Sequence, residues 1–202
     1  YTPGIRTSWQ WQLDGTIDTS FDVDVYDIDL FDAPQNVIDT LHNQGKKVIC
    51  YYSAGSWEPN RPDSDDFPQS VRGNPLDGFE EELWLDIREI QTLRPIMEER
   101  TALAVQKNCD AVEPDNVDGY INNSGFPLTG QDQLNYNMMI SEISHAVGLS
   151  VGLKNDLDQI VELVDFFDFA VNEQCFQYEE CDVLQPFIDQ NKAIFSCEYI
   201  EE

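Results

Sequence analysis

Residues 109–120, CDAVEPDNVDGY, combine an apolar stem with carboxylates and an amide. Glu113 and Asp115 are two residues apart, so on a β-strand both side chains point to the same face. Pro114 has no N–H to donate, so we expect the strand to end here, with Asp115 and Asn116 at its carboxyl-terminal edge. Carboxyl groups in that place could act as acid, base or nucleophile. The alternative interpretation is a capped polar loop whose carboxylates are only solvated.

The other predicted strands also end in polar side chains. In a parallel barrel all strand ends meet on one face, where many carboxylates are unfavourable unless they are paired, protonated or used in chemistry. A repeated polar strand end therefore indicates a site. The residues are Asp29 and Asp32 after the second strand, Tyr51, Tyr52 and Ser53 in the third, Asp86 in the fourth, Glu113, Asp115, Asn116 and Asp118 in the fifth, Lys154 and Asn155 in the sixth, Glu173 and Gln174 in the seventh, and Glu198 and Tyr199 in the eighth.

Carboxylates without a Ser-His-Asp set favour acid–base or glycosyl chemistry, and glycoside hydrolysis needs two carboxyl groups that flank the bond. Asp115 and Glu173 lie on strands two apart in order, so they are predicted to face each other across the mouth of the barrel. Glu113 would lie one layer deeper, where it could pair with Lys154 and hold the site in shape.

Aromatic side chains near the same edge could stack on sugar rings, although half or more of them are expected to be ordinary core residues. The candidates are Trp9, Trp11, Tyr51, Tyr52, Trp57, Trp84, Tyr120 and Tyr199. The two histidines, His42 and His145, fall in helical patterns and are predicted to be structural or on the surface.

The elements that must position these residues alternate between strand and helix patterns. Repeated βα units predict a parallel sheet, and eight strands predict a (β/α)8 TIM-like barrel in one domain spanning residues 1–202. The chain is short for this fold, so some helices are expected to be short or missing, including one after the last strand. An open doubly wound sheet is the alternative, but no glycine-rich phosphate loop supports it. Strands are predicted at 9–13, 23–31, 47–53, 83–87, from 109, 150–153, 167–172 and 193–196, and helices at 36–44, 89–107, 128–147, 157–164 and 178–190.

Between the third and fourth predicted strands, residues 54–78 are rich in Gly, Pro, Asn and Asp. This composition predicts a long loop with little regular structure. Loops of that length in a compact domain are usually functional.

The charge is strongly negative, with 11 Lys and Arg against 39 Asp and Glu and a net charge of −28. Such a field repels nucleic acid and anionic membranes and attracts a cationic polymer. The alternative is that the acidity only keeps a secreted protein in solution. No apolar run is long enough to span a membrane.

Five cysteines, at 50, 109, 175, 181 and 197, have no CxxC spacing, so we expect neither a metal site nor a cofactor. Cys175 and Cys181 are close enough for a small disulfide loop, and at least one thiol is left over. A disulfide and the sequon Asn122-Asn123-Ser124 favour a secreted, extracellular or cell-surface protein, expected to be a monomer. No leader is visible before Tyr1, so we expect it to have been removed or to lie outside this sequence.

Several runs of the sequence resemble glycoside hydrolase family 114, the endo-α-1,4-polygalactosaminidase family. YYSAGSWE and EPDNVDGY are the most specific, and the matching runs keep their order from Trp9 to Tyr199. The runs are WQWQL, DIDLFD, VICYYSAGSWE, LWLDI, DAVEPDNVDGY, GLKND, AVNEQC and CEY.

The resemblance implies a (β/α)8 barrel that hydrolyses α-1,4-galactosaminidic bonds within a galactosaminogalactan-type polysaccharide. It implies that the Asp of EPDN and the Glu of NEQ, here Asp115 and Glu173, form the catalytic pair. By analogy with α-galactosidase-type barrels, Asp115 would be the nucleophile and Glu173 the general acid/base of a retaining enzyme. A deacetylated galactosamine polymer is cationic near neutral pH, which would match the acidic chain.

The remaining polar residues at the strand ends are expected to bind this substrate: Asp29, Tyr51, Tyr52, Ser53, Asp86, Glu113, Asn116, Lys154, Asn155, Gln174 and Glu198. Among them, Asp29, Asp86 and Glu198 are candidates for binding the amine. One alternative function is a carbohydrate-binding barrel without catalysis, which would keep the aromatic rim but lack one carboxylate. Another is an isomerase or aldolase with Lys154 as a Schiff base, which the lack of phosphate-binding glycines disfavours.

Overall fold

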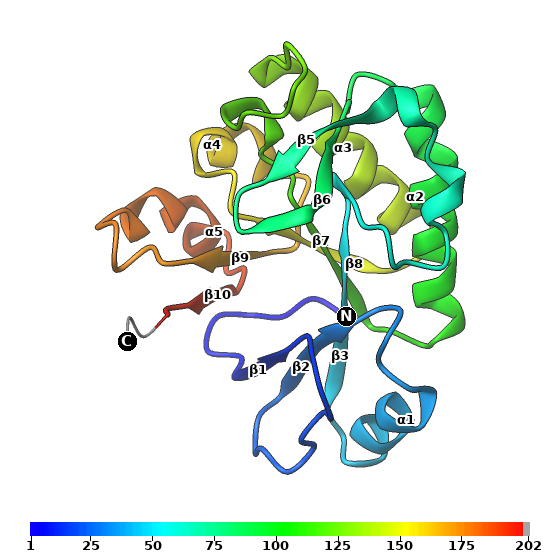
Figure 1. Ribbon diagram of the computed structural model, residues 1–202. Helices are drawn as coiled ribbons and strands as arrows, with labels where there is room; N and C mark the ends of the chain where they lie inside the picture. The colour runs from blue at the N-terminus through cyan, green and yellow to red at the C-terminus, as the bar shows by residue number, and fades with distance from the viewer. Residues whose placement is uncertain (200–202) are drawn as a thin grey trace.

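The computed structural model of the protein describes residues 1–199 and has seven parallel strands in one curved sheet, with helices packed outside it (Figure 1). This arrangement confirms the predicted TIM-like barrel. Each strand pairs in parallel with its neighbour in the order β1-β2-β3-β7-β8-β9-β10. The strands are β1 (Trp9–Gln12), β2 (Val25–Asp29), β3 (Lys47–Ser53), β7 (Ala111–Asp115), β8 (Ser150–Lys154), β9 (Phe169–Glu173) and β10 (Ile194–Cys197).

The helices on the outside are of very unequal length. The two longest, α2 and α3, pack against each other, and a Thr129–Asp132 capping box begins α3. As expected for a chain this short, α4 and α5 are only 4 and 5 residues long, and each follows a 3-10 turn. The helices are α1 (Gln35–Asn43), α2 (Ile90–Gln106), α3 (Gly130–Ala146), α4 (Ile160–Leu163) and α5 (Gln185–Asp189).

The fourth predicted strand, at 83–87, was expected to join the barrel, and that prediction is wrong. The prediction that residues 54–78 have little regular structure is also wrong. Residues 79–85 form β6 (Phe79–Leu85), which lies between β4 (Ser56–Trp57) and β5 (Arg72–Leu76) in a separate antiparallel sheet. Asp77-Gly78 forms the turn of the β5–β6 hairpin, with Gly78 at a φ of 82°. Because this hairpin satisfies β6 locally, β3 pairs directly with β7.

Side chains alternate between the interior of the barrel and the outer core that the helices cover. The lower part of the interior is apolar, and its buried residues are Val25, Ile49, Ala111, Phe169, Val171, Ala193 and Phe195. Inner positions further along the strands are instead ionic or polar: Asp27, Tyr51, Glu113, Lys154 and Glu173. The two-residue period thus places charged groups directly above an apolar base.

Between β1 and β10 the sheet is not joined by a strand ladder in the part of the chain that the structure describes. A single antiparallel bridge joins Gly4 to Lys192, and the Ala193 N–H donates to the Pro3 carbonyl at 3.2 Å. Above it, the ring of Trp9 stacks on Phe195 with centroids 4.9 Å apart. This seam therefore depends on aromatic packing more than on backbone hydrogen bonds.

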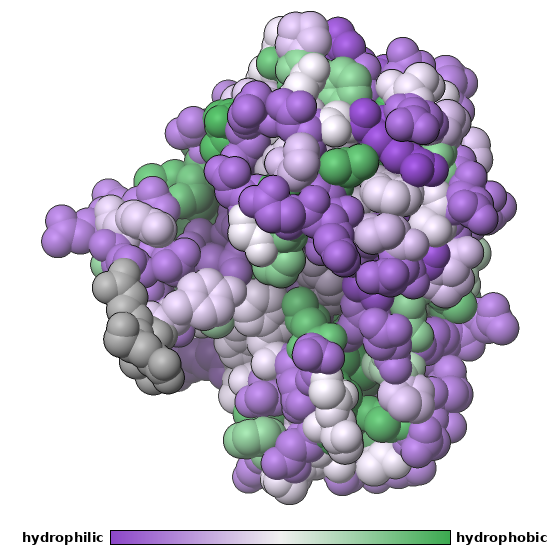
Figure 2. Space-filling model, viewed as in Figure 1, coloured by the Kyte–Doolittle hydropathy of each residue, from purple (hydrophilic) through white to green (hydrophobic). Residues whose placement is uncertain are grey.

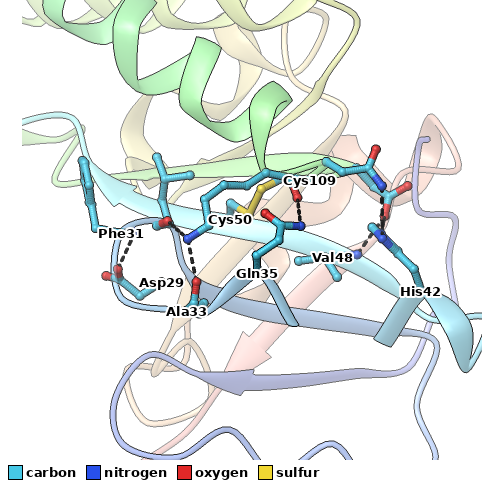
Figure 3. Close-up of a disulfide and its surroundings, with 12 residues drawn as sticks. Asp29, Phe31, Ala33, Gln35, His42, Val48, Cys50 and Cys109 are labelled. Atoms are coloured by element: carbon cyan, nitrogen blue, oxygen red, sulfur yellow. Dashed lines mark hydrogen bonds and ion pairs between the residues drawn. A yellow bond between two sulfur atoms is a disulfide. The ribbon is translucent and has the colours of Figure 1, made fainter. Parts of the chain in front are cut away.

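Two disulfides form among the five cysteines, and Cys197 is the remaining free thiol in residues 1–199. Cys175–Cys181 is the small loop that the spacing predicted. The second bond, Cys50–Cys109, joins β3 to the turn that enters β7 (Figure 3). It therefore links β3 and β7, the two strands between which the predicted strand at 83–87 was expected to lie.

The surface in Figure 2 is mostly hydrophilic, in keeping with the net charge of −28. Within residues 1–199, the structure contains no helix whose length and apolar character would let it cross a membrane.

Gly55, which follows β3, is required by a close backbone contact. A Cβ atom at this position would lie 1.6 Å from the carbonyl oxygen of Asn116. Asn116 directly follows β7, and its backbone cannot yield without moving the end of that strand. The glycine therefore fixes how closely the β3 loop approaches the end of β7.

We expect Gly55→Ala to lower the free energy of unfolding by at least about 1–3 kcal/mol, because overpacking forces backbone shifts. Urea denaturation would measure the loss. Gly4→Ala is the matched control, since a Cβ there has its nearest contact at 4.0 Å. Equal stability of the two variants would contradict this account of the contact.

Candidate active site

The carboxyl-terminal ends of the strands open into a cavity of about 720 Å³. Residues from β1, β2, β3, β7, β8 and β9 line its floor, and the 54–84 segment with its antiparallel sheet forms one wall. The predicted site residues that line it are Asp29, Asp32, Tyr51, Asp115, Asn116, Asp118, Lys154, Asn155 and Glu173. Of the predicted aromatic residues, Trp11, Tyr51, Trp84 and Tyr199 line the cavity.

Asp115, the last residue of β7, accepts hydrogen bonds from three donors. Its Oδ2 accepts from the Tyr51 hydroxyl at 3.0 Å, and its Oδ1 accepts from Lys154 Nζ at 3.1 Å and from the Asn116 N–H at 2.7 Å. Asn116 has a φ of 60°, a left-handed conformation that Asn tolerates. These donors fix the orientation of the carboxylate.

Glu173, the last residue of β9, is held from two sides. Its Oε2 accepts from Asn155 Nδ2 at 3.1 Å, and its Oε1 accepts from the Tyr199 hydroxyl. Asn155 also accepts from the Glu173 N–H at 3.0 Å, so it fixes both the backbone and the side chain. The carboxyl group is therefore oriented toward the cavity by its neighbours on β8 and after β10.

Lys154 lies between the two carboxylates. Its Nζ is 3.1 Å from Asp115 and 3.4 Å from Glu173, and 3.3 Å from Glu113 in the layer below. Burial alone would lower the pKa of Lys154, but the charges of Asp115, Glu113 and Glu173 outweigh it, so the pKa lies well above its ordinary value. The ring of Trp11 covers the ammonium at 5.0 Å. One cation thus binds both members of the predicted pair.

A second cation, Arg61, comes from the loop between β4 and β5. Its guanidinium binds Asp29 through two nitrogens at 2.6 and 3.0 Å, Glu58 at 2.7 Å and Asp32 at 3.1 Å. This clamp fastens the loop to the end of β2. It also neutralises Asp29, which had been a candidate for binding an amine.

Four predicted site residues lie outside the cavity because of local structure. Tyr52 faces the outer core, since β3 alternates and Tyr51 faces inward. Asp86 follows the antiparallel β6 and is held by Arg88 at 2.7 Å through two nitrogens. The Glu198 carboxylate accepts hydrogen bonds from the backbone N–H groups of residues 176 and 177. The Gln174 side-chain amide donates a hydrogen bond to the Gln177 side chain. Gln174 lies beside an adjoining hollow.

Two further predicted residues lie beneath the cavity and support it. Ser53 is fully buried, and its hydroxyl accepts from Asn116 Nδ2 at 2.9 Å. Glu113 is also fully buried, one layer below Asp115 on the same face of β7. Neither can touch a ligand in the cavity, so both act on it only through neighbouring residues.

Two carboxylates beside the pair are perturbed by burial. Desolvation, with the nearby charge of Asp115, raises the pKa of Asp118 to about 6. Desolvation, with the charge of Asp118, raises the pKa of Asp156 to about 8. The Asp156 Oδ2 accepts from Asn137 Nδ2 at 2.9 Å. Both groups therefore hold protons at pH values where exposed carboxylates are ionised.

Three further cavity residues, Glu58, Arg61 and Glu82, were not predicted from the sequence. Glu58 and Arg61 lie in the predicted loop 54–78, where no period relates spacing to direction, and Glu82 lies on β6, just before the strand predicted at 83–87. The only available signal was the length of the loop, which predicted function without assigning residues. Asp27 was also missed, although its two-residue spacing from Asp29 places it on the inner face of β2. No cluster of His, Cys, Asp and Glu in residues 1–199 has the arrangement of a metal site.

Comparison with known proteins places this site in a family. The sequence pattern of glycoside-hydrolase family GH114 matches residues 1–202. The crystal structure of Aspergillus fumigatus Ega3 in complex with galactosamine is 43% identical, with a TM-score of 0.95 over 98% of this chain and 79% of that one. No curated protein matches the chain.

Two more distant structures share the fold alone. The glycoside hydrolase domain of PelA from Pseudomonas aeruginosa is 11% identical, with a TM-score of 0.71 over 96% of this chain and 83% of that one. Amy13B from Eubacterium rectale is 9% identical, with a TM-score of 0.59 over 87% of this chain and 50% of that one. The barrel is therefore retained where little sequence identity remains.

The raised pKa of Asp156 gives a prediction for stability. The folded protein holds the proton more tightly than the unfolded chain, so this group makes the free energy of unfolding fall as pH rises from its ordinary value of 3.8 to about 8. Asp156→Asn removes the titration and keeps the acceptor for Asn137. We expect urea unfolding at about pH 5 and about pH 8 to differ less for this variant than for the wild type.

The matched control is Asp39→Asn, because Asp39 is exposed on α1 and is not among the charges that act on Asp156. It should keep the wild-type difference between the two pH values. If Asp156→Asn and the wild type lost the same stability on raising the pH, burial of Asp156 would not be the cause.

Proposed function

This chain belongs to glycoside hydrolase family GH114, and from that membership we propose that it cleaves α-1,4-galactosaminidic bonds inside a galactosamine-containing polysaccharide. The galactosamine bound in the 43% identical Ega3 structure supports the choice of sugar. One contact carries the proposal for the catalytic pair: the Lys154 ammonium lies between Asp115 and Glu173, at the mouth of the barrel.

We infer that Asp115 is the nucleophile and Glu173 the general acid/base. The hydrogen bonds from Tyr51, Lys154 and the Asn116 N–H suit a carboxylate that attacks the anomeric carbon. Glu173 would protonate the glycosidic oxygen as the bond breaks and then take a proton from the water that releases the glycosyl-enzyme. Asn155 and Tyr199 would hold its carboxyl group in line with the leaving oxygen.

The separation of the pair supports a retaining mechanism. Because one ammonium nitrogen contacts both carboxylates, the two contacting oxygens lie no more than about 6.5 Å apart. Retaining enzymes have carboxyl groups about 5–5.5 Å apart, and inverting enzymes need about 6.5–9.5 Å to admit a water. A lysine shared by the two carboxylates therefore fits the shorter separation, at which Asp115 attacks the anomeric carbon directly.

Recognition of the cationic sugar is assigned to cavity carboxylates that no cation neutralises. Among residues 1–199, Arg61 pairs with Asp29 and Arg88 pairs with Asp86, whereas the partly buried cavity residues Asp118 and Glu82 have no Lys, Arg or His within ion-pair distance. The nearest donors to Asp118 and Glu82 are the Asn122 amide and the Ser56 hydroxyl. These two carboxylates are therefore proposed as the ammonium-binding groups.

Two disulfides support secretion, since such bonds persist in oxidising compartments. A cationic polymer outside the cell would also be attracted by the net charge of −28.

The catalytic assignment predicts that Asp115→Asn and Glu173→Gln each lower kcat by roughly 100- to 10,000-fold on a deacetylated α-1,4-galactosamine polymer. Release of reducing ends measures activity, and circular dichroism checks folding. Asp39→Asn on the exposed face of α1 is the isosteric control and should keep wild-type activity. With an activated leaving group, Glu173→Gln should accumulate a glycosyl adduct on Asp115, detected by mass spectrometry.

Near wild-type activity in either variant would refute the pair. An adduct on another residue would refute the role of Asp115. A wild-type protein that binds the polymer but releases no reducing ends would favour a carbohydrate-binding barrel.

The recognition assignment predicts that Asp118→Asn lowers kcat/KM on the deacetylated polymer by roughly 10- to 100-fold, mainly through KM. Activity on an N-acetylated polymer should change less. Because the pKa of Asp118 is about 6, the wild-type KM should rise as the pH falls below that value, and the variant should lack this rise. Equal effects on both polymers would show that Asp118 does not bind the amine.

A further inference from the structure

Beneath the catalytic pair the barrel holds two more carboxyl groups, on Asp27 of β2 and Glu113 of β7. Both side chains have no exposed surface. The proposed reaction gives neither of them a direct role, because neither reaches the cavity. Two buried carboxylates in contact would repel each other at low dielectric, so the pair needs a physical explanation.

The first observation is the lack of hydrogen-bond donors around the pair. Among residues 1–199, no group donates a hydrogen bond of good geometry to either oxygen of Asp27 or to either oxygen of Glu113. The two carboxyl groups lie within hydrogen-bonding reach of each other. Two ionised carboxylates are acceptors only and cannot satisfy each other. A single proton between them supplies the missing donor.

The second observation is the charge balance. Lys154 Nζ contacts Glu113, Asp115 and Glu173 at 3.3, 3.1 and 3.4 Å, but has no such contact with Asp27. Three carboxyl groups thus contact one ammonium, and Asp27, the fourth in the cluster, is left without a cation. The proton between the two buried groups is therefore expected to reside on Asp27.

The electrostatics point the same way. Desolvation, then the charge of Glu113, raises the pKa of Asp27 well above its ordinary value, and Asp115 adds to the rise while Lys154 opposes it. Desolvation also raises the pKa of Glu113, but Lys154 and the hydrogen bond from Asp27 oppose this. Of the two groups, Asp27 holds the proton more strongly.

We propose that Asp27 is a positioning residue that stays protonated and donates a hydrogen bond to Glu113. Glu113 then remains the charged carboxylate that contacts Lys154 from below. Lys154 in turn holds Asp115 and Glu173 at their working separation. A second charge on Asp27 would draw Lys154 down, away from the pair. The proposal rests on the proposed function only for the roles of Asp115 and Glu173.

The protonation is tested without any substrate. In infrared difference spectra at neutral pH, the wild type minus Asp27→Asn should show the C=O stretching band of a protonated carboxyl group. Asp29→Asn is the matched control on the same strand, because Asp29 is ion-paired with Arg61. Its difference spectrum should show a carboxylate band instead. A carboxylate band lost in Asp27→Asn would overturn the proposal.

The positioning role is tested by kinetics on the same polymer. Asp27→Asn keeps a neutral donor for Glu113 and should stay within a few-fold of the wild-type kcat. Asp27→Leu keeps the volume but removes the donor, so kcat should fall roughly 10- to 100-fold with little change in KM. Equal kcat values for the Leu and Asn variants would refute the role in positioning.

The two arms separate the possible failures. The infrared arm needs only Asp27→Asn, so it decides the protonation even if Asp27→Leu does not fold. If the wild type does not cleave the polymer, the proposed function fails, but the spectra still decide whether Asp27 carries the proton.

Discussion

The site depends on one buried ammonium. Removing a lysine from water is strongly unfavourable, and contacts with several carboxylates offset this. Lys154 meets that requirement because β7, β8 and β9 are neighbours, so their inward side chains converge on one point. The carboxylates in turn tolerate one another because the ammonium lies between them. Neither side of the arrangement would be stable alone, and so the cation and the proposed catalytic pair are positioned together.

The inner face of the barrel could be predicted from the sequence because it follows from a two-residue period and parallel pairing. Glu113, Asp115, Lys154 and Glu173 come together for that reason alone. The wall of the cavity could not be predicted, since Arg61 reaches it from a loop whose path depends on tertiary ion pairs. The fourth strand was misplaced because a run such as LWLDI has the same pattern in a barrel and in a hairpin.

Charge is distributed unevenly around the cavity despite the large excess of acidic residues. On one side, Arg61 gathers Asp29, Asp32 and Glu58 into one ion-paired cluster. On the other side, burial disfavours the charged forms of Asp118 and Asp156 and raises their pKa values. The acidity of the chain as a whole therefore says little about any one carboxylate. What decides each group's state is its depth and whether a cation reaches it.

The seam between β1 and β10 has a consequence for how the cleft moves. Trp11 on β1 and Tyr199 after β10 line the cavity on the two sides of that seam. Elsewhere, widening the barrel breaks a ladder of backbone bonds, but here it disturbs one bridge and a stack of rings. Thermal breathing should therefore concentrate at this edge. A polymer of the proposed kind would then enter from the side at one of its internal sugars, rather than being threaded from a free end.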